Sequence, residues 1–251
     1  MLEEELGFAN ELADEAAEIA LPLFRTEPEV RMKADDTPVT KADLEIEAMV
    51  RGRVAQRFPE DAVLGEEGGG ELGPGRVWIV DPIDGTKNFA AGVPVWGTLL
   101  ALAVDGEPVL GAVSAPALGE RYETVRGGGA RWNGSPIRVS DVDSLEQAAV
   151  CHYATEEWLG TSRQAALFDL VRDTHRSVGF TDFWGHCLVA RGSLEVMLEP
   201  SLRIWDWAAL EVLVEEAGGM MTTFDGSPVA DGTSVLTTNR RLHDELVSRL
   251  S

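Results

Sequence analysis

A short apolar run that ends in two aspartates restricts the fold more than any other part of this sequence. Residues 77–80 read Val-Trp-Ile-Val, and residues 81–86 follow as Asp-Pro-Ile-Asp-Gly-Thr. An apolar run of this length predicts a buried strand. Pro82 fixes its own φ and restricts the backbone of Asp81, while Gly85 permits an unusual backbone angle or the close approach of a ligand. We therefore expect a stiff loop after the strand that carries two carboxylates.

Two carboxylates at a strand end suit a hard cation such as Mg²⁺, which prefers oxygen ligands and keeps several waters. The amides of Gly85 and Thr86 would then face an anion. An ordinary aspartate-rich turn explains the segment equally well from residue types alone. Three other acidic positions are similarly ambiguous, because each also fits a solvated loop or a helix N-cap: Glu66, Asp206 and Asp43.

The composition is that of a globular protein. Of the 251 residues, 44% are hydrophobic and 25% are charged, which is close to ordinary usage. The length fits one large domain. We expect a single domain of residues 1–251 made of two lobes, roughly 1–145 and 146–251.

The charge and the cysteines exclude several classes of protein. A net charge of −22 argues against a nucleic-acid partner, because that binding is dominated by basic side chains. The longest mostly apolar stretch, residues 92–104, is shorter than the ~20 residues that span a bilayer, and the N-terminus lacks the features of a secretory signal. Cys151 and Cys187 form no C-x-x-C pair, which favours buried free thiols. We expect a cytoplasmic protein with no membrane contact.

Short strands and amphipathic helices alternate along the chain, which predicts a layered α/β fold. The Asp105-Gly106 and Asn133-Gly134 pairs predict tight turns. We expect helices over residues 2–24, 43–57, 163–173, 182–191, 206–217 and 240–250. We expect strands over residues 62–64, 77–80, 96–104, 109–114, 121–125, 148–153, 176–179, 195–198, 220–224 and 234–237.

Four segments together make the sequence specific where each alone is ambiguous. They are Val39–Asp43, Gly65–Glu67, Trp78–Phe89 and Trp205–Gly219. In order and spacing they resemble the inositol-monophosphatase-like superfamily of Mg²⁺-dependent, lithium-sensitive phosphatases, over nearly the whole chain. The resemblance implies a five-layer αβαβα sandwich, which the expected element order permits but does not establish. It also implies a homodimer with two or three Mg²⁺ ions per subunit.

The resemblance assigns roles to the acidic positions. One Mg²⁺ would be held by Glu66, Asp81 and the backbone carbonyl of Ile83. A second would be held by Asp81, Asp84 and Asp206, and Glu66 would also help to hold a third, weaker ion. Asp43 and Thr86 would orient the attacking water, and the amides of Gly85 and Thr86 would cradle the phosphate. The reaction implied is the hydrolysis of a phosphate monoester without a protein nucleophile.

Within the superfamily, four further segments look like the bacterial histidinol-phosphate phosphatase branch: Gly85–Phe89, Gly92–Trp96, Ser114–Leu118 and Phe180–His186. This implies that the substrate is L-histidinol phosphate, an intermediate of histidine biosynthesis. Its alcohol part carries an amine and an imidazole, so we expect carboxylates and an aromatic wall around it.

The candidates for this substrate-binding role are Glu199, Asp182, Arg176 and Trp184. Trp184 also fits a core position, and Asp182 also fits a helix N-cap; we interpret His186 as a packing residue. The main alternative function is an inositol-1-monophosphatase or a broad small-molecule phosphatase. A phosphatase for adenosine 3′,5′-bisphosphate and a non-catalytic regulatory binding protein are less favoured.

Overall fold

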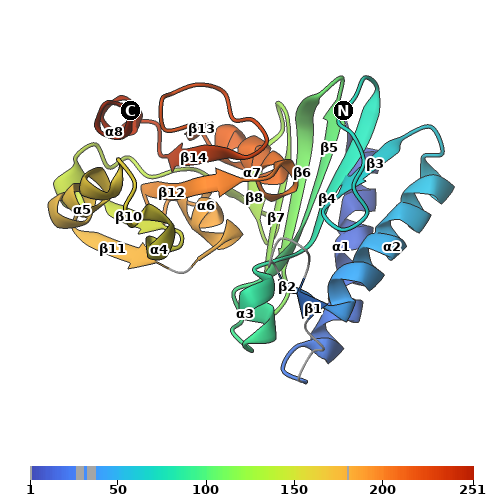
Figure 1. Cartoon of the computed structure of the whole chain (residues 1–251). Helices are drawn as coiled ribbons and strands as arrows, with labels where there is room; N and C mark the ends of the chain where they lie inside the picture. The colour runs from blue at the N-terminus through green and yellow to red at the C-terminus, as the bar shows by residue number, and fades with distance from the viewer. Residues whose placement is uncertain (1, 27–30, 33–37, 180) are drawn as a thin grey trace.

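The chain folds into five alternating layers of helix and sheet (Figure 1). The structure is a computed structural model that describes residues 2–26, 31–32, 38–179 and 181–251. A seven-stranded sheet has helices α1 and α2 on one face and α6 and α7 on the other. A five-stranded sheet covers the far side of α6 and carries α5 and α8 on its outer face. The αβαβα sandwich that the resemblance implies is therefore confirmed.

The seven-stranded sheet is buried on both faces. In β4, Val77 and Ile79 pack toward α7, whereas Trp78 and Val80 pack toward α1 and α2. This explains why β4 is apolar at every position instead of alternating. Its strands lie in sequence order, and only β3 and β4 run parallel: β3 (Ala62–Gly65), β4 (Arg76–Asp84), β5 (Gly97–Val104), β6 (Glu107–Ala115), β7 (Glu120–Val125), β8 (Gly129–Trp132) and β9 (Ser135–Ile137).

Two helices cover the outer face of this sheet, α1 (Glu3–Leu23) and α2 (Lys41–Arg57). Each buries residues four apart, as an amphipathic helix must; Ile46, Val50 and Val54 of α2 are fully buried. The end of α2 just before Phe58 and Pro59 follows from the conformational restriction that proline places on the preceding residue.

The five-stranded sheet has the order β11-β10-β12-β14-β13, and β10 runs parallel to both of its neighbours. In β12, Leu198 packs outward and Met197 packs toward α6, so Glu199 shares the inner face with Met197. The strands are β10 (Ala149–His152), β11 (Arg176–Gly179), β12 (Val196–Leu202), β13 (Met220–Thr222) and β14 (Thr233–Thr238). The helices are α5 (Gln164–Asp173), α6 (Phe183–Ala190), α7 (Ile204–Glu216) and α8 (His243–Leu250).

Helix α7 lies directly on the backbone of β6. A Cβ atom added to Gly111 of β6 would collide with the carbonyl oxygen of Ala209 in α7. Only glycine permits this approach, and the contact fixes how far α7 stands from the seven-stranded sheet.

The expected helices and strands all form, with shifted ends. Both predicted tight turns are confirmed, since Asp105, Gly106, Asn133 and Gly134 have positive φ angles. The expectation of a loop directly after Val80 was wrong, because β4 continues to Asp84. Several short elements were not expected: β1 (Arg31–Met32), β2 (Pro38–Val39), α3 (Thr86–Ala90), β8, β9, a 3-10 turn at Leu145–Gln147 and α4 (Thr155–Trp158).

Phe180, which opens one of the resembling segments, lies outside the described residues. Among the helices in the described part of the chain, none combines the length and the apolar character needed to cross a bilayer.

Candidate active site

The end of β4 contains a bulge that presents two aspartates. The strand pairs regularly with β5 as far as Asp81, and pairing resumes at Asp84 after a register shift. Pro82 lies in the shifted segment, where its missing N–H costs the sheet no hydrogen bond, and its carbonyl accepts a hydrogen bond from Thr98 at 2.8 Å. The side chain of Ile83 is buried in the core. Both carboxylates consequently reach the same pocket.

The turn after Asp84 requires glycine. Gly85 has a φ of 79°, and a Cβ atom on it would lie 2.8 Å from the carbonyl oxygen of Val95. Helix α3 starts immediately afterwards at Thr86, whose hydroxyl lies 2.9 Å from the carbonyl oxygen of Ile83. The first N–H groups of a helix have no partner within it, so the backbone here can donate to an anion.

Asp43 and Asp206 each stand three positions after the N-cap residue of their helix, so neither is the N-cap that the sequence allowed, but each bonds back to that residue. Oδ2 of Asp43 accepts hydrogen bonds from the N–H of Thr40, at 2.8 Å, and from its hydroxyl, which holds the start of α2. Its Oδ1 lies 3.4 Å from the Thr86 hydroxyl. Asp206 likewise accepts the N–H of Arg203 at 2.7 Å with Oδ2, at the start of α7. In each case hydrogen bonds at the helix start hold one carboxylate oxygen, and this sets the direction in which the other carboxylate oxygen points.

Glu66 lies in a loop that α2 holds in place. Glu47, which is 3% exposed, accepts the N–H groups of Glu67 and Gly68, both at 2.7 Å. Arg51 pairs with Glu47 and donates to the carbonyl of Gly69 at 2.6 Å. Glu47 was not expected from the sequence, because its only signal is that it lies one helical turn after Asp43.

Asp81, Asp84 and Asp206 form a cluster suited to a cation. Each offers one carboxylate oxygen, and these oxygens lie within 4.8 Å of one another. Oδ1 of Asp81 is buried without a hydrogen-bond partner among the described residues. Burial and the neighbouring charges raise the pKa of Asp81 and Asp84 well above the ordinary value, and burial raises the pKa of Asp206 to about 7. An all-oxygen set under mutual repulsion fits a hard divalent cation.

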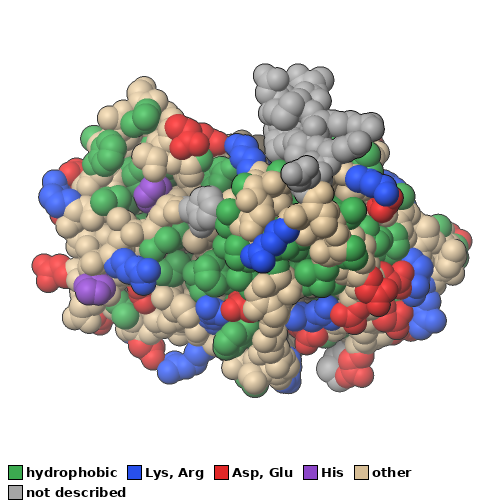
Figure 2. Space-filling view, turned by 90° about the horizontal axis from the view of Figure 1, so that it is seen from below, with side chains coloured by type: hydrophobic (Ala, Val, Ile, Leu, Met, Phe, Trp, Pro, Cys, Tyr) green, Lys and Arg blue, Asp and Glu red, His purple; other side chains and the backbone are tan. Residues whose placement is uncertain are grey.

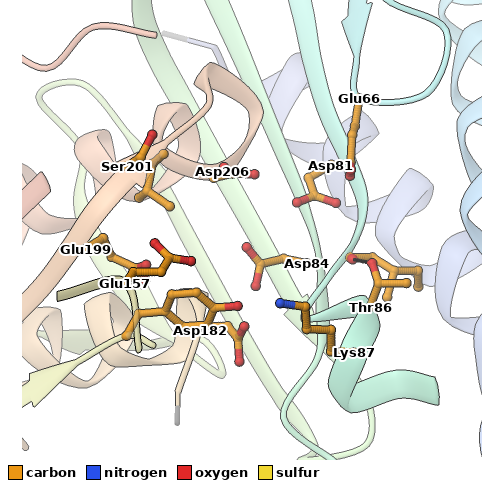
Figure 3. A pocket seen from close by; sticks show the side chains of 14 residues that line it. Glu66, Asp81, Asp84, Thr86, Lys87, Glu157, Asp182, Glu199, Ser201 and Asp206 are labelled. Atoms are coloured by element: carbon orange, nitrogen blue, oxygen red, sulfur yellow. Dashed lines mark hydrogen bonds between the residues drawn. The ribbon is translucent and has the colours of Figure 1, made fainter. Parts of the chain in front are cut away.

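These residues open onto a pocket of about 290 Å³ between the two sheets. Figure 3 shows Glu66, Asp81, Thr86 and Lys87 on one side and Glu157, Asp182, Glu199 and Ser201 on the other. Both sides lie at the carboxyl ends of parallel strands, β3 and β4 on one and β10, β11 and β12 on the other. The pocket is lined by Glu66, Asp81, Ile83, Asp84, Gly85, Thr86, Lys87, Tyr153, Glu157, Asp182, Glu199, Ser201, Leu202 and Asp206.

Asp182 occupies the N-cap position of α6 but does not cap the helix with its side chain. Its Oδ2 accepts a hydrogen bond from Asn88 at 2.6 Å, and Oδ1 of Asp84 accepts the N–H of Phe183 at 3.2 Å instead. Asp182 has a φ of 44°, a strained value for a residue with a side chain. Burial raises its pKa to about 6, against the lowering effect of Asn88 and of the Lys87 charge.

Glu199 is 3% exposed and projects from the inner face of β12 into the pocket. Burial, followed by the charges of Asp84 and Asp182, raises the pKa of its carboxyl well above the ordinary value. Five further pocket residues were not expected from the sequence: Lys87, Tyr153, Glu157, Ser201 and Leu202. Lys87 stands inside the segment that carries the resemblance, so its position was a usable signal; the other four had none.

Trp184 and Arg176 do not line this pocket. The indole N–H of Trp184 donates to Glu120 at 2.8 Å, and its ring packs against the core and the Arg191 guanidinium, which is the packing role left open for it. Arg176 is exposed at the start of β11. Their contact with a substrate stays a prediction.

Comparison with known proteins agrees with this arrangement. Residues 1–251 match the model of the inositol monophosphatase family. The chain belongs to that family. The histidinol-phosphatase of Mycobacterium tuberculosis is 42% identical, with 100% of this chain and 99% of the relative covered. The histidinol-phosphatase of Streptomyces coelicolor is 40% identical over 99% and 97%. A solved Thermotoga maritima IMPase superposes with a TM-score of 0.91 at 31% identity, covering 98% and 96%.

Membership of the family explains why the four segments occur together. The family segments supply five acids from four separate elements or loops: Asp43, Glu66, Asp81, Asp84 and Asp206. Four of them line the pocket, and Asp43 lies behind Thr86 of the pocket wall.

Proposed function

We propose that this protein is a Mg²⁺-dependent phosphatase that hydrolyses L-histidinol phosphate to L-histidinol and phosphate. The observation that carries the substrate assignment is the second acidic wall, Glu157, Asp182 and Glu199, which faces the carboxylate cluster across the pocket. A pocket with acids on both sides suits a substrate whose phosphate binds through cations at one end and whose other end is itself cationic. The relatives named as histidinol-phosphatases support the same substrate.

In this proposal Asp81, Asp84 and Asp206 hold one Mg²⁺, and Glu66, Asp81 and the Ile83 carbonyl hold another. Bound Mg²⁺ supplies positive charge that polarises the phosphate and acidifies the attacking water. The unpartnered Asp81 oxygen and the mutual repulsion of the cluster support this assignment. These two ligand sets support the proposal of two ions, and a third, weaker one beside Glu66 stays a prediction.

Thr86 and Asp43 orient the nucleophile. The Thr86 hydroxyl lies between the Ile83 carbonyl and Oδ1 of Asp43, so a water beside it can donate its proton toward Asp43 while its lone pair points at phosphorus. The backbone N–H groups of Gly85 and Thr86 hold the phosphate oxygens. The water oxygen forms a bond to phosphorus as its proton passes toward Asp43, the ester P–O bond breaks, and the departing alkoxide takes up a proton from a second water.

The opposite wall selects the alcohol. The protonated amine of histidinol can pair with Glu199 or Asp182, and the imidazole can lie against the Tyr153 ring. Charge-assisted hydrogen bonds of this kind contribute roughly 1.5–3 kcal/mol each. Asn88 fixes the orientation of Asp182 in advance, which reduces the entropy lost on binding.

The test is a comparison of kcat/KM with Mg²⁺ on four phosphate esters. They are L-histidinol phosphate, myo-inositol 1-phosphate, fructose 1,6-bisphosphate and adenosine 3′,5′-bisphosphate. We expect histidinol phosphate to be preferred by at least about tenfold, which corresponds to roughly 1.4 kcal/mol of transition-state discrimination. Equal or better turnover of any other ester would overturn the assignment.

The second candidate is an inositol-1-monophosphatase or a broad phosphatase. The close structural similarity to a solved protein described as an IMPase favours it. Inositol is uncharged apart from its phosphate, so its binding would add no positive charge beside Glu157, Asp182 and Glu199; Lys87 already acts on the first two. The same four-substrate comparison separates the two candidates.

We also propose that the protein is a cytoplasmic homodimer. Viewed from below, hydrophobic side chains gather across the middle of one face, and most acidic side chains lie toward its edges (Figure 2). A second copy would bury such a patch. Cys151 and Cys187 are buried free thiols, which supports a reducing compartment. A single domain with lobes at about 1–145 and 146–251 stays a prediction.

A further inference from the structure

His186 is a fully buried histidine that the proposed reaction does not use. It lies on α6, in the layer between the two sheets, and is 0% exposed. Its Nδ1 lies 2.8 Å from the hydroxyl of Thr237, which is also 0% exposed, on β14. Its Nε2 is buried without a hydrogen-bond partner among the described residues. An unpaired buried ring nitrogen is costly, so its retention needs an explanation.

The group that Nε2 faces is Glu199. Nε2 of His186 lies 3.6 Å from Oε1 of Glu199, just beyond hydrogen-bond length. Glu199 lines the pocket, and its inner-face position on β12 brings it toward α6. A small rotation of the Glu199 side chain would therefore close the contact with Nε2.

We propose that His186 positions Glu199 for the cationic group of the substrate. Nε2–H donates to Oε1, and the other carboxylate oxygen is left to face the pocket. This inference rests on the proposed function, and it names the residue that orients its specificity-determining carboxylate.

The partner at Nδ1 determines which ring nitrogen carries the proton. A neutral imidazole has one donor and one acceptor nitrogen. When the Thr237 hydroxyl donates to Nδ1, the proton must be on Nε2, where Glu199 accepts it. Burial lowers the pKa of His186 to about 3, so the ring is neutral in the working range and adds no positive charge that would compete with the substrate for Glu199.

Glu199 needs such a donor because the charged groups that affect it most are acids. Asp84, Asp182, Asp206 and Glu157 all disfavour its ionised form. A hydrogen bond to the carboxylate opposes their effect. Without it, the buried carboxyl would be more readily protonated and would offer the substrate amine a weaker partner.

The activity test measures substrate discrimination in His186→Met, His186→Gln and Thr237→Val. The readout is the ratio of kcat/KM for L-histidinol phosphate to that for 4-nitrophenyl phosphate, which has no amine. His186→Met, which cannot donate, should lower this ratio about tenfold, mainly through KM. His186→Gln, which can donate through its amide, should restore most of it. Thr237→Val should show a smaller loss in the same direction.

A double-mutant cycle with Glu199→Gln separates positioning from a general packing role. In the Glu199→Gln background, His186→Met should change the ratio no further. An undiminished tenfold loss in that background, or no loss in the single variant, would overturn the inference. If the wild-type enzyme does not prefer histidinol phosphate, the proposed function fails instead.

A spectroscopic readout covers that case and does not depend on activity. Nitrogen-15 NMR of the four histidines, assigned with His186→Met, reports which ring nitrogen of His186 is protonated. We expect the Nε2–H tautomer in the wild type and a shifted Nε2 resonance in Glu199→Gln. A proton on Nδ1, or a resonance unchanged by Glu199→Gln, would contradict the inference.

Discussion

The two walls of the pocket are both acidic, but they are built differently. The wall from the seven-stranded sheet brings Asp81 and Asp84 together with Asp206 of α7, with oxygens within 4.8 Å of one another. The wall from the five-stranded sheet spreads Glu157, Asp182 and Glu199 over separate elements. The carboxylates of the first wall repel one another unless a cation lies between them. The carboxylates of the second wall lie apart and have different neighbours, such as Asn88, which donates a hydrogen bond to Asp182.

This difference separates chemistry from selection. A convergent cluster neutralised by metal suits any phosphate ester, since it meets only the phosphate and the water. Dispersed carboxylates meet the alcohol, which differs between substrates. Substitutions on the first wall should therefore affect all substrates alike, and substitutions on the second should change their ranking.

The largest effect is expected from Asp84→Asn. Removing this charge from the cluster should lower kcat/KM for both L-histidinol phosphate and 4-nitrophenyl phosphate by at least about a thousandfold, because metal charge stabilisation contributes several kcal/mol. Glu211→Gln is the matched control, since Glu211 lies on α7 like Asp206 but outside the pocket. Near-normal turnover by Asp84→Asn would remove the cluster from the chemistry.

Asp43→Asn should reduce kcat for both substrates by about a hundredfold, the order of effect expected for a group that accepts a proton. Its amide oxygen can still accept the hydrogen bonds from Thr40, so the melting temperature should change little. Asp43→Ala should lose both activity and ~1 kcal/mol of helix-start stability. If Asp43→Asn kept full activity while Asp43→Ala was unstable, Asp43 would serve only α2.

On the second wall, Glu199→Gln should lower kcat/KM for L-histidinol phosphate by about 10- to 100-fold, because a charged hydrogen bond becomes a neutral one. The loss on 4-nitrophenyl phosphate should be far smaller. Asp182→Asn should show the same pattern. Steady-state kinetics on both substrates provides the measurement. Equal losses on the two substrates would show that the second wall does not select the alcohol.

The smallest expected effect is the change in melting temperature when Mg²⁺ is removed. Burial raises the pKa of Asp206 from its ordinary value of 3.8 to about 7, so its contribution to stability is present below about pH 4 and is lost as pH rises through about 7. Mg²⁺ opposes this loss. The difference in melting temperature between Mg²⁺ and EDTA should thus widen from pH 4 to 7, at about 2–4 °C per kcal/mol. A difference that stays constant or narrows would contradict the cluster as the metal site.

The sequence predicted most of the first wall and two acids of the second, Asp182 and Glu199, but not Glu157. Asp81, Asp84, Glu66 and Asp206 stand beside glycines, prolines or helix starts, which are local signals readable along the chain. The bulge in β4 was hidden because Pro82 is typical of a loop, and only the pairing with β5 shows that the strand resumes at Asp84.

The residues of the second wall that were not expected depend on distant strand pairings that no local pattern reveals. Tyr153 and Glu157 follow β10, and they reach the pocket because β10 runs parallel to β12, more than forty positions later in the chain. Helices α3 and α4 are only 5 and 4 residues long, too short for a helical period to emerge. His186 was correctly placed in the core, but its orientation toward Glu199 required the layer between the sheets to be known.

Gly111 shows how a residue that touches no ligand can set the size of a cation site. Because Ala209 lies against it, a methyl group at this position would push α7 outward and carry Asp206 with it, one helical turn away. The ion selectivity of the cluster would change, since Mg²⁺ demands ligand distances of ~2.1 Å and Ca²⁺ accepts ~2.4 Å. A search for variants with altered metal preference should therefore include this glycine among its targets.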